Sequence, residues 1–257
     1  LLAQDDLSLF ASAVDSTFLT RTLRSNRRNY TVIAPTNDGL VGLDPKYYTP
    51  PWMVHLESIL GYHIVLLRYL TSGDLAGITE LNRGGVNAPW NITNEATLVL
   101  DNGLGPPVSI VQVDLLAGNG VVHKLDGFMV PTVLTVNLLE VASSLNFFSI
   151  VLELVASVGL EEELTSQDVT LFAPANQYFS QELLVSLEAS PDATNTVVRY
   201  HAVPEVYPIS LLTDGLELST LLEGETLMVS NTAGTISINE IPLGSVGFDA
   251  PGSNGLA

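Results

Sequence analysis

Histidine is the residue type in this chain best suited to proton transfer, and it occurs only four times. The four are His55, His63, His123 and His201. A histidine acts as a general acid or base when a reacting hydroxyl or a carboxylate lies within hydrogen-bond reach. His63 and His201 each follow a tyrosine, Tyr62 and Tyr200, inside apolar segments, which favours core histidines that bind backbone groups. His123, in an alternating strand pattern, is also predicted to be structural.

Signatures of catalytic and cofactor sites are missing from the sequence. It has no Gly-x-Ser-x-Gly turn, no His-Glu-x-x-His zinc pair, no phosphate loop and no dinucleotide fingerprint. Cysteine is absent, which excludes disulfides, thiolate zinc sites and cysteine nucleophiles. The run Glu161 to Glu163 lacks the spacing of a calcium loop and is expected to be solvated. We therefore predict no catalytic residue, no metal site and no cofactor.

Composition indicates a folded acidic protein of one large domain or two ordinary ones. The 257 residues are 46% hydrophobic and 14% charged, which excludes intrinsic disorder. The net charge of −19 would repel a phosphate backbone, so nucleic acid is not an expected partner. Mean hydropathy is +0.33, but the best candidate for a span, residues 147–160, contains Glu153 and is shorter than the roughly 18 residues a bilayer requires.

Basic residues are concentrated in the first half of the chain. Residues 1–131 carry eight basic and twelve acidic residues, whereas residues 132–257 carry Arg199 and sixteen acidic residues. The predicted basic contact patch comprises Arg21, Arg24, Arg27 and Arg28, with three of the four on one side of a helix if the helix extends that far. This patch could bind an anionic polysaccharide or the acidic half of a neighbouring chain. Ordinary surface salt bridging is the simpler alternative.

Three motifs occur twice in the same order, which indicates an internal repeat of about 130 residues. Thr31-Val-Ile-Ala-Pro-Thr-Asn-Asp38 is repeated as Thr170-Leu-Phe-Ala-Pro-Ala-Asn-Gln177. Tyr62-His63 is repeated as Tyr200-His201, and Asp114, five residues before Asn119-Gly120, is repeated as Asp249 before Asn254-Gly255. The spacing predicts two domains, residues 1–131 and 132–257, joined by a short linker after Pro131.

Each repeat is expected to place helices before strands. Apolar residues at helical spacing predict helices over residues 7–14 and 147–158, the first capped by Asp5 or Asp6. Strands are predicted over residues 31–34 and 170–173, each ended by a proline. Alternating residues around turns predict hairpins over residues 97–113 and 226–239. The fold class is therefore α+β, with antiparallel sheet half-covered by helices.

Taken together, the three repeated motifs resemble those of the fasciclin-like domain family. The resemblance also covers Asp114-Leu-Leu-Ala-Gly-Asn-Gly-Val-Val-His-Lys-Leu-Asp126 and Val130-Pro131. It implies two tandem domains, each a β-sandwich wedge of mainly antiparallel strands with a helical cap. The second domain is expected to end before its last strand, the counterpart of residues 121–125, and the first to lack a helix that residues 135–145 supply to the second.

The resemblance also implies candidate contact residues for adhesion. In animal relatives, Tyr-His and Asp-Ile stretches resemble proposed integrin contacts, which singles out Tyr62, His63, Asp114, His123, Tyr200, His201 and Asp249. Leu115 and Ala250 replace the isoleucine here, so a turn-forming role for Asp114 and Asp249 is the favoured alternative. Two sequons, at Asn91 and Asn29, permit N-glycosylation if the chain enters a secretory pathway.

From these observations we expect a non-enzymatic, extracellular adhesion or matrix protein, secreted or anchored through a segment not present here. Its expected partners are cell-surface or matrix proteins, anionic polysaccharide, or a second copy in homophilic contact. The alternative is a carrier of a small apolar ligand or lipid, which requires a cavity of more than ~300 Å³ between sheet and helices. A hydrolase with two perturbed carboxylates, or with His123 beside a hydroxyl, is the third and least favoured hypothesis.

Overall fold

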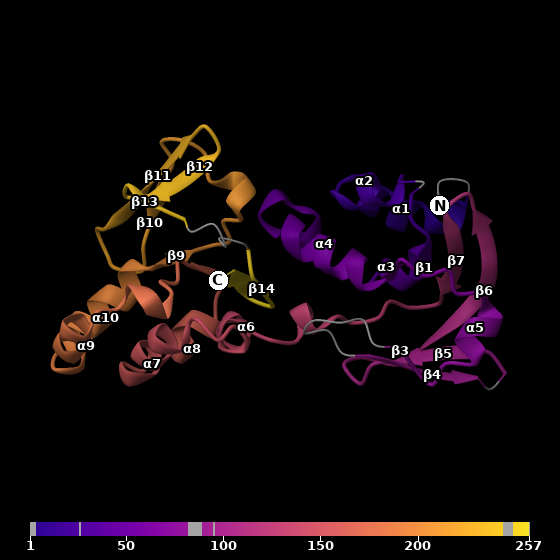
Figure 1. Cartoon of the computed structure of the whole chain (residues 1–257), viewed down its shortest axis with the longest axis horizontal. Coiled ribbons are helices and arrows are strands. Elements are labelled where there is room, and N and C mark those ends of the chain that lie inside the picture. Colours follow the sequence, from indigo (N-terminus) through magenta and orange to yellow (C-terminus); the bar gives the residue numbers. More distant parts are fainter. Residues whose placement is uncertain (1–3, 26, 82–88, 95, 244–248, 257) are drawn as a thin grey trace. The chain divides into compact units, whose positions relative to one another are not determined.

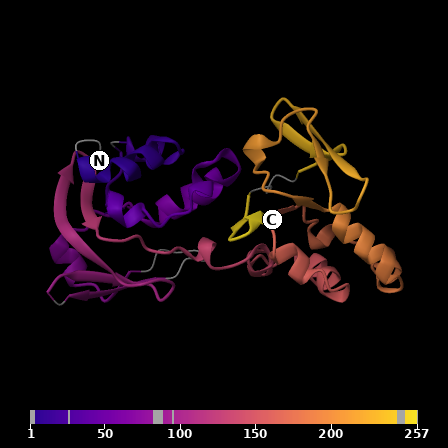
Figure 2. The same cartoon turned by 180° about the vertical axis from the view of Figure 1, so that it is seen from behind.

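The computed structural model divides the chain into two compact units, Leu1–Thr135 (unit 1) and Val136–Ala257 (unit 2). The structure describes residues 4–25, 27–81, 89–94, 96–243 and 249–256. Figures 1 and 2 show helices and strands in both units, which confirms the α+β fold class. Within these ranges, no helix is both long and apolar enough to cross a bilayer.

Unit 1 begins with helices and ends with sheet. Its helices are α1 (Ser8–Asp15), α2 (Leu19–Leu23), α3 (Asn37–Leu40), α4 (Met53–Tyr62) and α5 (Ser72–Ala76). Its strands are β1 (Tyr30–Pro35), β2 (Ile64–Leu66), β3 (Glu80–Leu81), β4 (Trp90–Asn94), β5 (Leu98–Asp101), β6 (Val108–Ala117) and β7 (Gly120–Leu125). Short 3-10 turns lie at Asp5–Leu7, Pro45–Tyr48, Pro50–Trp52 and Thr132–Leu134.

These strands form one sheet in the order β2-β1-β7-β6-β5-β4-β3. Strand β6 pairs with β7 at one end and with β5 at the other, and Figure 1 shows it bending between the two halves of the sheet. The ladder with β7 shifts register between Ile110 and Leu115, and Asp114 has a φ of 57° there. Such irregularities bend a strand and increase its twist, so the curl of the wedge originates here.

The first and last strands of unit 1, β1 and β7, pair in parallel from Tyr30 opposite Gly120 to Pro35 opposite Leu125. Pro35 therefore belongs to the strand it was predicted to end. The close approach requires glycine, because a Cβ at Gly120 would overlap the carbonyl oxygen of Tyr30. The Asn119 carbonyl accepts from the Tyr30 N–H, which fixes the register at the start of the pair.

Unit 2 repeats this plan. Its helices are α6 (Leu138–Ser144), α7 (Ser149–Ser157), α8 (Glu161–Thr165), α9 (Gln181–Glu188) and α10 (Pro191–Tyr200), with 3-10 turns at Asn176–Tyr178 and Ile209–Leu211. Its strands are β8 (Val169–Leu171), β9 (Ala202–Pro204), β10 (Glu217–Ser219), β11 (Thr226–Thr232), β12 (Thr235–Ile238), β13 (Ile241–Pro242), β14 (Pro251–Gly252) and β15 (Gly255–Leu256). Strand β15 is the counterpart of the first two residues of β7, and it pairs in parallel with β8 as β7 does with β1.

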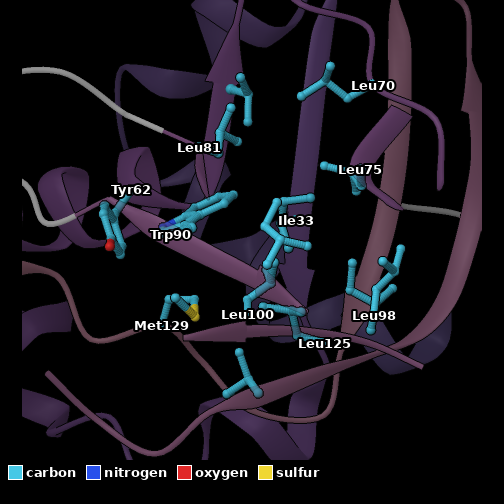
Figure 3. Packing of buried hydrophobic residues seen from close by; sticks show 14 residues of the cluster. Ile33, Tyr62, Leu70, Leu75, Leu81, Trp90, Leu98, Leu100, Leu125 and Met129 are labelled. Atoms are coloured by element: carbon cyan, nitrogen blue, oxygen red, sulfur yellow. The ribbon is translucent and has the colours of Figure 1, made fainter. Parts of the chain in front are cut away.

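The buried apolar side chains come from the predicted strands and helices and also from elements that the sequence analysis did not place, such as α5, β4 and α9. In unit 1, a cluster that includes Ile33, Trp90 and Leu100 fills the space inside the curled sheet (Figure 3). In unit 2, one cluster joins α6, α7 and α8 to β8, and another lies beneath the hairpin of β11 and β12. That hairpin turns through Ala233 and Gly234, both at positive φ, as a tight two-residue turn requires.

The glycine at the parallel seam generates a stability prediction. Gly120→Ala is expected to destabilise unit 1 by about 1–3 kcal/mol, because the new methyl group must push the backbones of β1 and β7 apart. Trp52 and Trp90 are the only tryptophans and both lie in unit 1, so their fluorescence during denaturant unfolding measures this unit.

Gly118→Ala is the matched control. It lies two residues away, and a Cβ built there meets no atom within 4 Å. Its free energy of unfolding should stay within about 0.5 kcal/mol of that of the parent protein. Equal effects of the two substitutions would show that the parallel seam tolerates a side chain at Gly120.

Candidate functional site

The repeated tyrosine–histidine pair lies at the end of a helix in each unit and faces the interior. The Nδ1 atom of His63 lies 2.9 Å from the Ile59 carbonyl oxygen, and that of His201 lies 2.8 Å from the Val197 oxygen. In unit 1, the Met129 N–H donates to Nε2 of His63 at 3.0 Å, so both ring nitrogens bind backbone groups. The ring of His63 thereby joins the end of α4 to the segment that follows β7.

The tyrosine hydroxyls bind equivalent asparagines. Asn102 donates to the Tyr62 hydroxyl at 2.8 Å, and Asn239 donates to the Tyr200 hydroxyl at 2.7 Å. Tyr62 and His63 are buried, with exposed fractions of 2% and 1%, whereas Tyr200 and His201 are half-buried. A partner surface cannot reach the first pair without unfolding, so Tyr62 and His63 serve packing rather than surface contact.

The motif asparagines Asn37 and Asn176 bind the preceding helix. Oδ1 of Asn37 accepts from the Leu9 N–H at 2.9 Å, and Oδ1 of Asn176 accepts from the Ile150 N–H at 3.0 Å. These are first-turn N–H groups, which have no partner within the helix. The predicted cap by Asp5 or Asp6 is therefore wrong, because Asn37, 28 residues away from Leu9, satisfies that N–H.

Asp114 and His123 do lie together, beside Ser72. The Ser72 hydroxyl and backbone N–H donate to the Asp114 carboxylate at 2.5 and 2.8 Å. Nε2 of His123 lies 2.8 Å from the Leu70 carbonyl oxygen, and the Asp114 N–H donates to Nδ1 at 3.3 Å. The histidine thus binds two backbone groups and the serine binds the carboxylate. This arrangement is a brace between β6, β7 and α5, and it gives Ser72 no imidazole base.

Electrostatics keep His123 neutral. Burial lowers the pKa of His123, and this effect outweighs the Leu70 carbonyl and the Asp114 carboxylate, which both raise it. For Asp114, burial raises the pKa, but the two hydrogen bonds from Ser72 and the neighbouring His123 lower it, and the net pKa is lowered. The pair is therefore carboxylate plus neutral imidazole near neutral pH.

Asp249 occupies the same repeat position as Asp114 but has a different environment. Its carboxylate accepts from the Ile209 N–H at 2.9 and 3.2 Å, and isoleucine supplies no hydroxyl where unit 1 has Ser72. Burial raises the pKa of Asp249, and the single backbone donor only partly opposes this. At this repeat position, the ionised form of Asp114 is therefore stabilised by the fold, whereas the ionised form of Asp249 is destabilised by burial.

The predicted surface residues are exposed. Asn29 and Asn91 both point to solvent, Asn29 before β1 and Asn91 on β4. The four arginines of the basic patch are also exposed, but α2 ends at Leu23, so Arg27 and Arg28 lie beyond the helix. Helical spacing therefore does not place the four arginines on one helix face. Arg27 and Arg28 lie instead in the segment that leads into β1.

A cavity of about 390 Å³ lies in unit 1 between the first helices and the sheet. Apolar side chains of α1, β1 and β7, including Val14, Val32 and Val121, form much of its wall. Leu23, Arg24 and Asn119 also line it. The volume lies at the lower end of the roughly 300–1,000 Å³ of small-molecule sites.

The two repeat aspartates predict opposite mutational effects. Asp114→Asn is expected to lower the stability of unit 1 at pH 7, because a carboxyl group with a lowered folded pKa contributes stability that is present above its ordinary pKa of 3.8 and is lost as pH falls through the folded pKa. Asp249→Asn is expected to raise the stability of unit 2 at pH 7, because a raised pKa marks a carboxylate that folding disfavours. Tryptophan fluorescence follows the first variant and far-ultraviolet circular dichroism the second; changes of the same sign would contradict this assignment.

His123 predicts acid sensitivity in unit 1. Since the folded pKa of His123 is lowered, the unfolded chain binds more protons once pH falls below the ordinary histidine pKa of 6.5, and stability should fall as pH drops from 7 to 5. His123→Gln keeps a donor and an acceptor but does not titrate, so its loss of stability over this range should be smaller. Urea unfolding followed by tryptophan fluorescence measures both, and an unchanged slope in the variant would exclude His123 as the source.

Comparisons with known proteins agree with the internal repeat. The profile of the family described as "Fasciclin domain" matches residues 5–131 and 146–257. A curated relative, "Fasciclin-like arabinogalactan protein CTB11" of Cercospora beticola, is 30% identical over 166 residues, 64% of this chain. The chain covers only 41% of that relative.

A solved structure also resembles this one. It is described as a FAS1 domain pair from the insect cell adhesion molecule Fasciclin I, with a TM-score of 0.46 and 16% identity, covering 98% of this chain and 94% of that one. The family assignment rests on the profile, whose two matches include the repeated asparagines, the tyrosine–histidine pairs and the seam glycines. The chain belongs to the fasciclin domain family and carries two such domains in tandem.

Proposed function

We propose that this chain is a non-enzymatic extracellular protein for adhesion or matrix contact, acting through the surface of its two domains. Fasciclin domains are adhesion-like modules, typically of extracellular or cell-surface proteins. The observation that supports the non-enzymatic part of this proposal is that the motif side chains are used inside the fold. The buried histidines bind backbone groups, and the aspartates accept from backbone N–H groups.

The arginine patch of unit 1 is the contact surface best suited to a charged partner. The Arg24 side chain is 72% exposed and makes one long contact, 3.7 Å, with Asp15. Arg199 of unit 2 is 27% exposed and donates two hydrogen bonds to Glu163 at 2.7 and 2.6 Å. The four arginines of the patch are thus open to a partner, whereas the basic group of unit 2 is held by its own domain.

An anionic polysaccharide is the partner class that these charges favour. Guanidinium groups pair with carboxylate and sulfate groups through several N–H donors. The acidic unit 2 of a second copy is the homophilic alternative, since unit 2 carries a net charge of −15 and unit 1 only −4. Both contacts are electrostatic and exposed, so salt should weaken them.

A carrier of a small apolar ligand is the second candidate, and the cavity in unit 1 supports it. Its volume of about 390 Å³ exceeds the minimum that this hypothesis requires. The corresponding surface of unit 2 is covered by helix α6 of the same chain. The hydrolase hypothesis gains no support at His123, because both of its ring nitrogens bind backbone groups.

The arginine patch gives the test of the proposed contact. Arg27→Gln combined with Arg28→Gln is expected to lower retention on immobilised polygalacturonate at low salt, with the parent protein eluting earlier as salt rises. Lys46→Gln combined with Arg68→Gln has the same net charge but changes residues outside the patch, and should elute close to the parent. Equal losses in both variants would indicate a dependence on net charge alone and would contradict a localised contact. Analytical ultracentrifugation of the same proteins tests the homophilic alternative.

A further inference from the structure

One of the two glycosylation sequons lies within the arginine patch. Its asparagine, Asn29, directly follows Arg28, and both side chains are exposed. At the equivalent positions of unit 2 the chain has Gln167 and Asp168, so it has neither the basic residue nor the acceptor. The sequon and the patch therefore occur together in unit 1, where a glycan on one residue would stand beside the other.

A surface hollow of about 320 Å³ lies inside the patch, next to the sequon. It is lined by Thr22, Ser25, Arg27, Arg28 and Tyr30. Arginines and hydroxyl-bearing residues thus surround it, which suits the carboxylate and hydroxyl groups of an acidic sugar. Tyr30 is the middle residue of the sequon, so Asn29 adjoins this hollow.

Hydrogen bonds hold the start of β1, where Asn29 lies, against the end of α2. The Tyr30 hydroxyl donates to the Thr22 carbonyl at 2.7 Å, and the Tyr30 N–H donates to the Asn119 carbonyl at 3.0 Å. The side chain of Asn119 donates to the Leu23 carbonyl at 2.7 Å. Because α2 and β1 are joined in this way, the attachment point at Asn29 is fixed beside the patch.

The threonine of the sequon determines when a glycan can be added. Thr31 is completely buried, and its hydroxyl donates to the Arg68 carbonyl at 3.0 Å and accepts from the Leu70 N–H at 2.9 Å. Since N-glycosylation requires this hydroxyl as well as the asparagine, Asn29 is an acceptor only before β1 pairs with β2. The exposed Asn29 can still carry the glycan after folding. Its occupancy is therefore set while the chain folds.

We propose that an N-linked glycan at Asn29 masks the arginine patch and thereby controls binding of the anionic polysaccharide. The glycan acts on the polysaccharide contact proposed above, on which this inference rests. Arg27 and Arg28 are two and one residues away, so their Cα atoms lie within about 7 Å of that of Asn29. Exposed ion pairs require an approach of about 4 Å between nitrogen and oxygen, which a bulky glycan at this place prevents.

The second sequon supplies a matched control. Asn91 is exposed on β4, opposite Glu80 of β3 and Asp101 of β5. In the sheet, β5, β6 and β7 lie between β4 and β1. A glycan at Asn91 has the same chemistry as one at Asn29 but stands on the other half of the sheet, so it should leave the patch open.

The test compares chains that carry a glycan at one sequon only. Asn91→Gln leaves Asn29 as the acceptor, Asn29→Gln leaves Asn91, and the double variant has neither. All are produced in a secretory host that adds neutral oligomannose glycans, so the charge is unchanged, and mass spectrometry gives the occupancy of each site. Lectin chromatography isolates the glycosylated fraction of each single variant, and binding to immobilised polygalacturonate at low salt gives an apparent Kd.

Glycosylated Asn91→Gln should bind at least about fivefold more weakly than the double variant, because several small ion-pair contributions are lost together. Glycosylated Asn29→Gln should bind like the double variant. Trimming of glycosylated Asn91→Gln with endoglycosidase H leaves one uncharged N-acetylglucosamine at Asn29 and should restore most of the affinity. This step separates the effect of the glycan from that of the substitution.

Each contrary result has a definite meaning. Equal affinities of glycosylated Asn91→Gln and the double variant would overturn the masking and leave the polysaccharide contact standing. Equal losses from the two glycans would show an effect of bulk alone and would also overturn it. A parent chain without a glycan at Asn29 would mean that β1 closes before transfer, which removes the proposed control. Failure of the double variant to bind would overturn the polysaccharide contact, and this inference with it.

Discussion

The parallel pairing of the first strand of each unit with its last is the constraint on which the rest of the structure depends. It joins Tyr30–Pro35 to Gly120–Leu125 in unit 1 and Val169–Leu171 to Gly255–Leu256 in unit 2. A parallel pair cannot be closed by a tight turn, so the chain between its strands must form a long connection. In unit 1 that connection contains α3 to α5 and the strands β2 to β6. The seam glycine lets the two backbones meet, and its neighbouring asparagine ties the preceding loop to the same point.

Periodicity and repetition made much of this fold predictable. Helices at residues 8–15 and 149–157 and the hairpin of unit 2 lie close to their predicted positions, because their apolar patterns are local. The partner of a polar side chain is not local. Asn37 binds Leu9 across 28 residues, and Thr31 accepts from the Leu70 N–H across 39, so spacing alone could not assign these roles. Their recurrence in Asn176 and Thr170 was the available signal, because a residue repeated at one offset in two copies indicates a shared structural contact.

The two units share this parallel pairing of strands but differ in the side chains around it. Ser72 gives Asp114 a hydroxyl donor, whereas Ile209 leaves Asp249 with a backbone donor. Basic residues also differ: the four arginines of the patch are exposed on unit 1, whereas the single basic residue of unit 2, Arg199, is ion-paired. A tandem repeat thus keeps the contacts that close each domain and varies those that meet the surroundings. The site candidates implied by family resemblance, such as His63, belong to the first kind, and the arginines belong to the second.

The orientation of the seam also has a mechanical consequence for a protein under tension. The chain enters β1 at Tyr30 and leaves β7 at Leu125, and in a parallel pair these two points lie at opposite ends of the ladder. Traction on the chain at these points therefore shears the two strands along their length. The hydrogen bonds between β1 and β7 then bear the force at the same time. In an antiparallel hairpin pulled at its open end, the hydrogen bonds break one after another. Unit 1 is accordingly built to resist extension most strongly along its own chain direction.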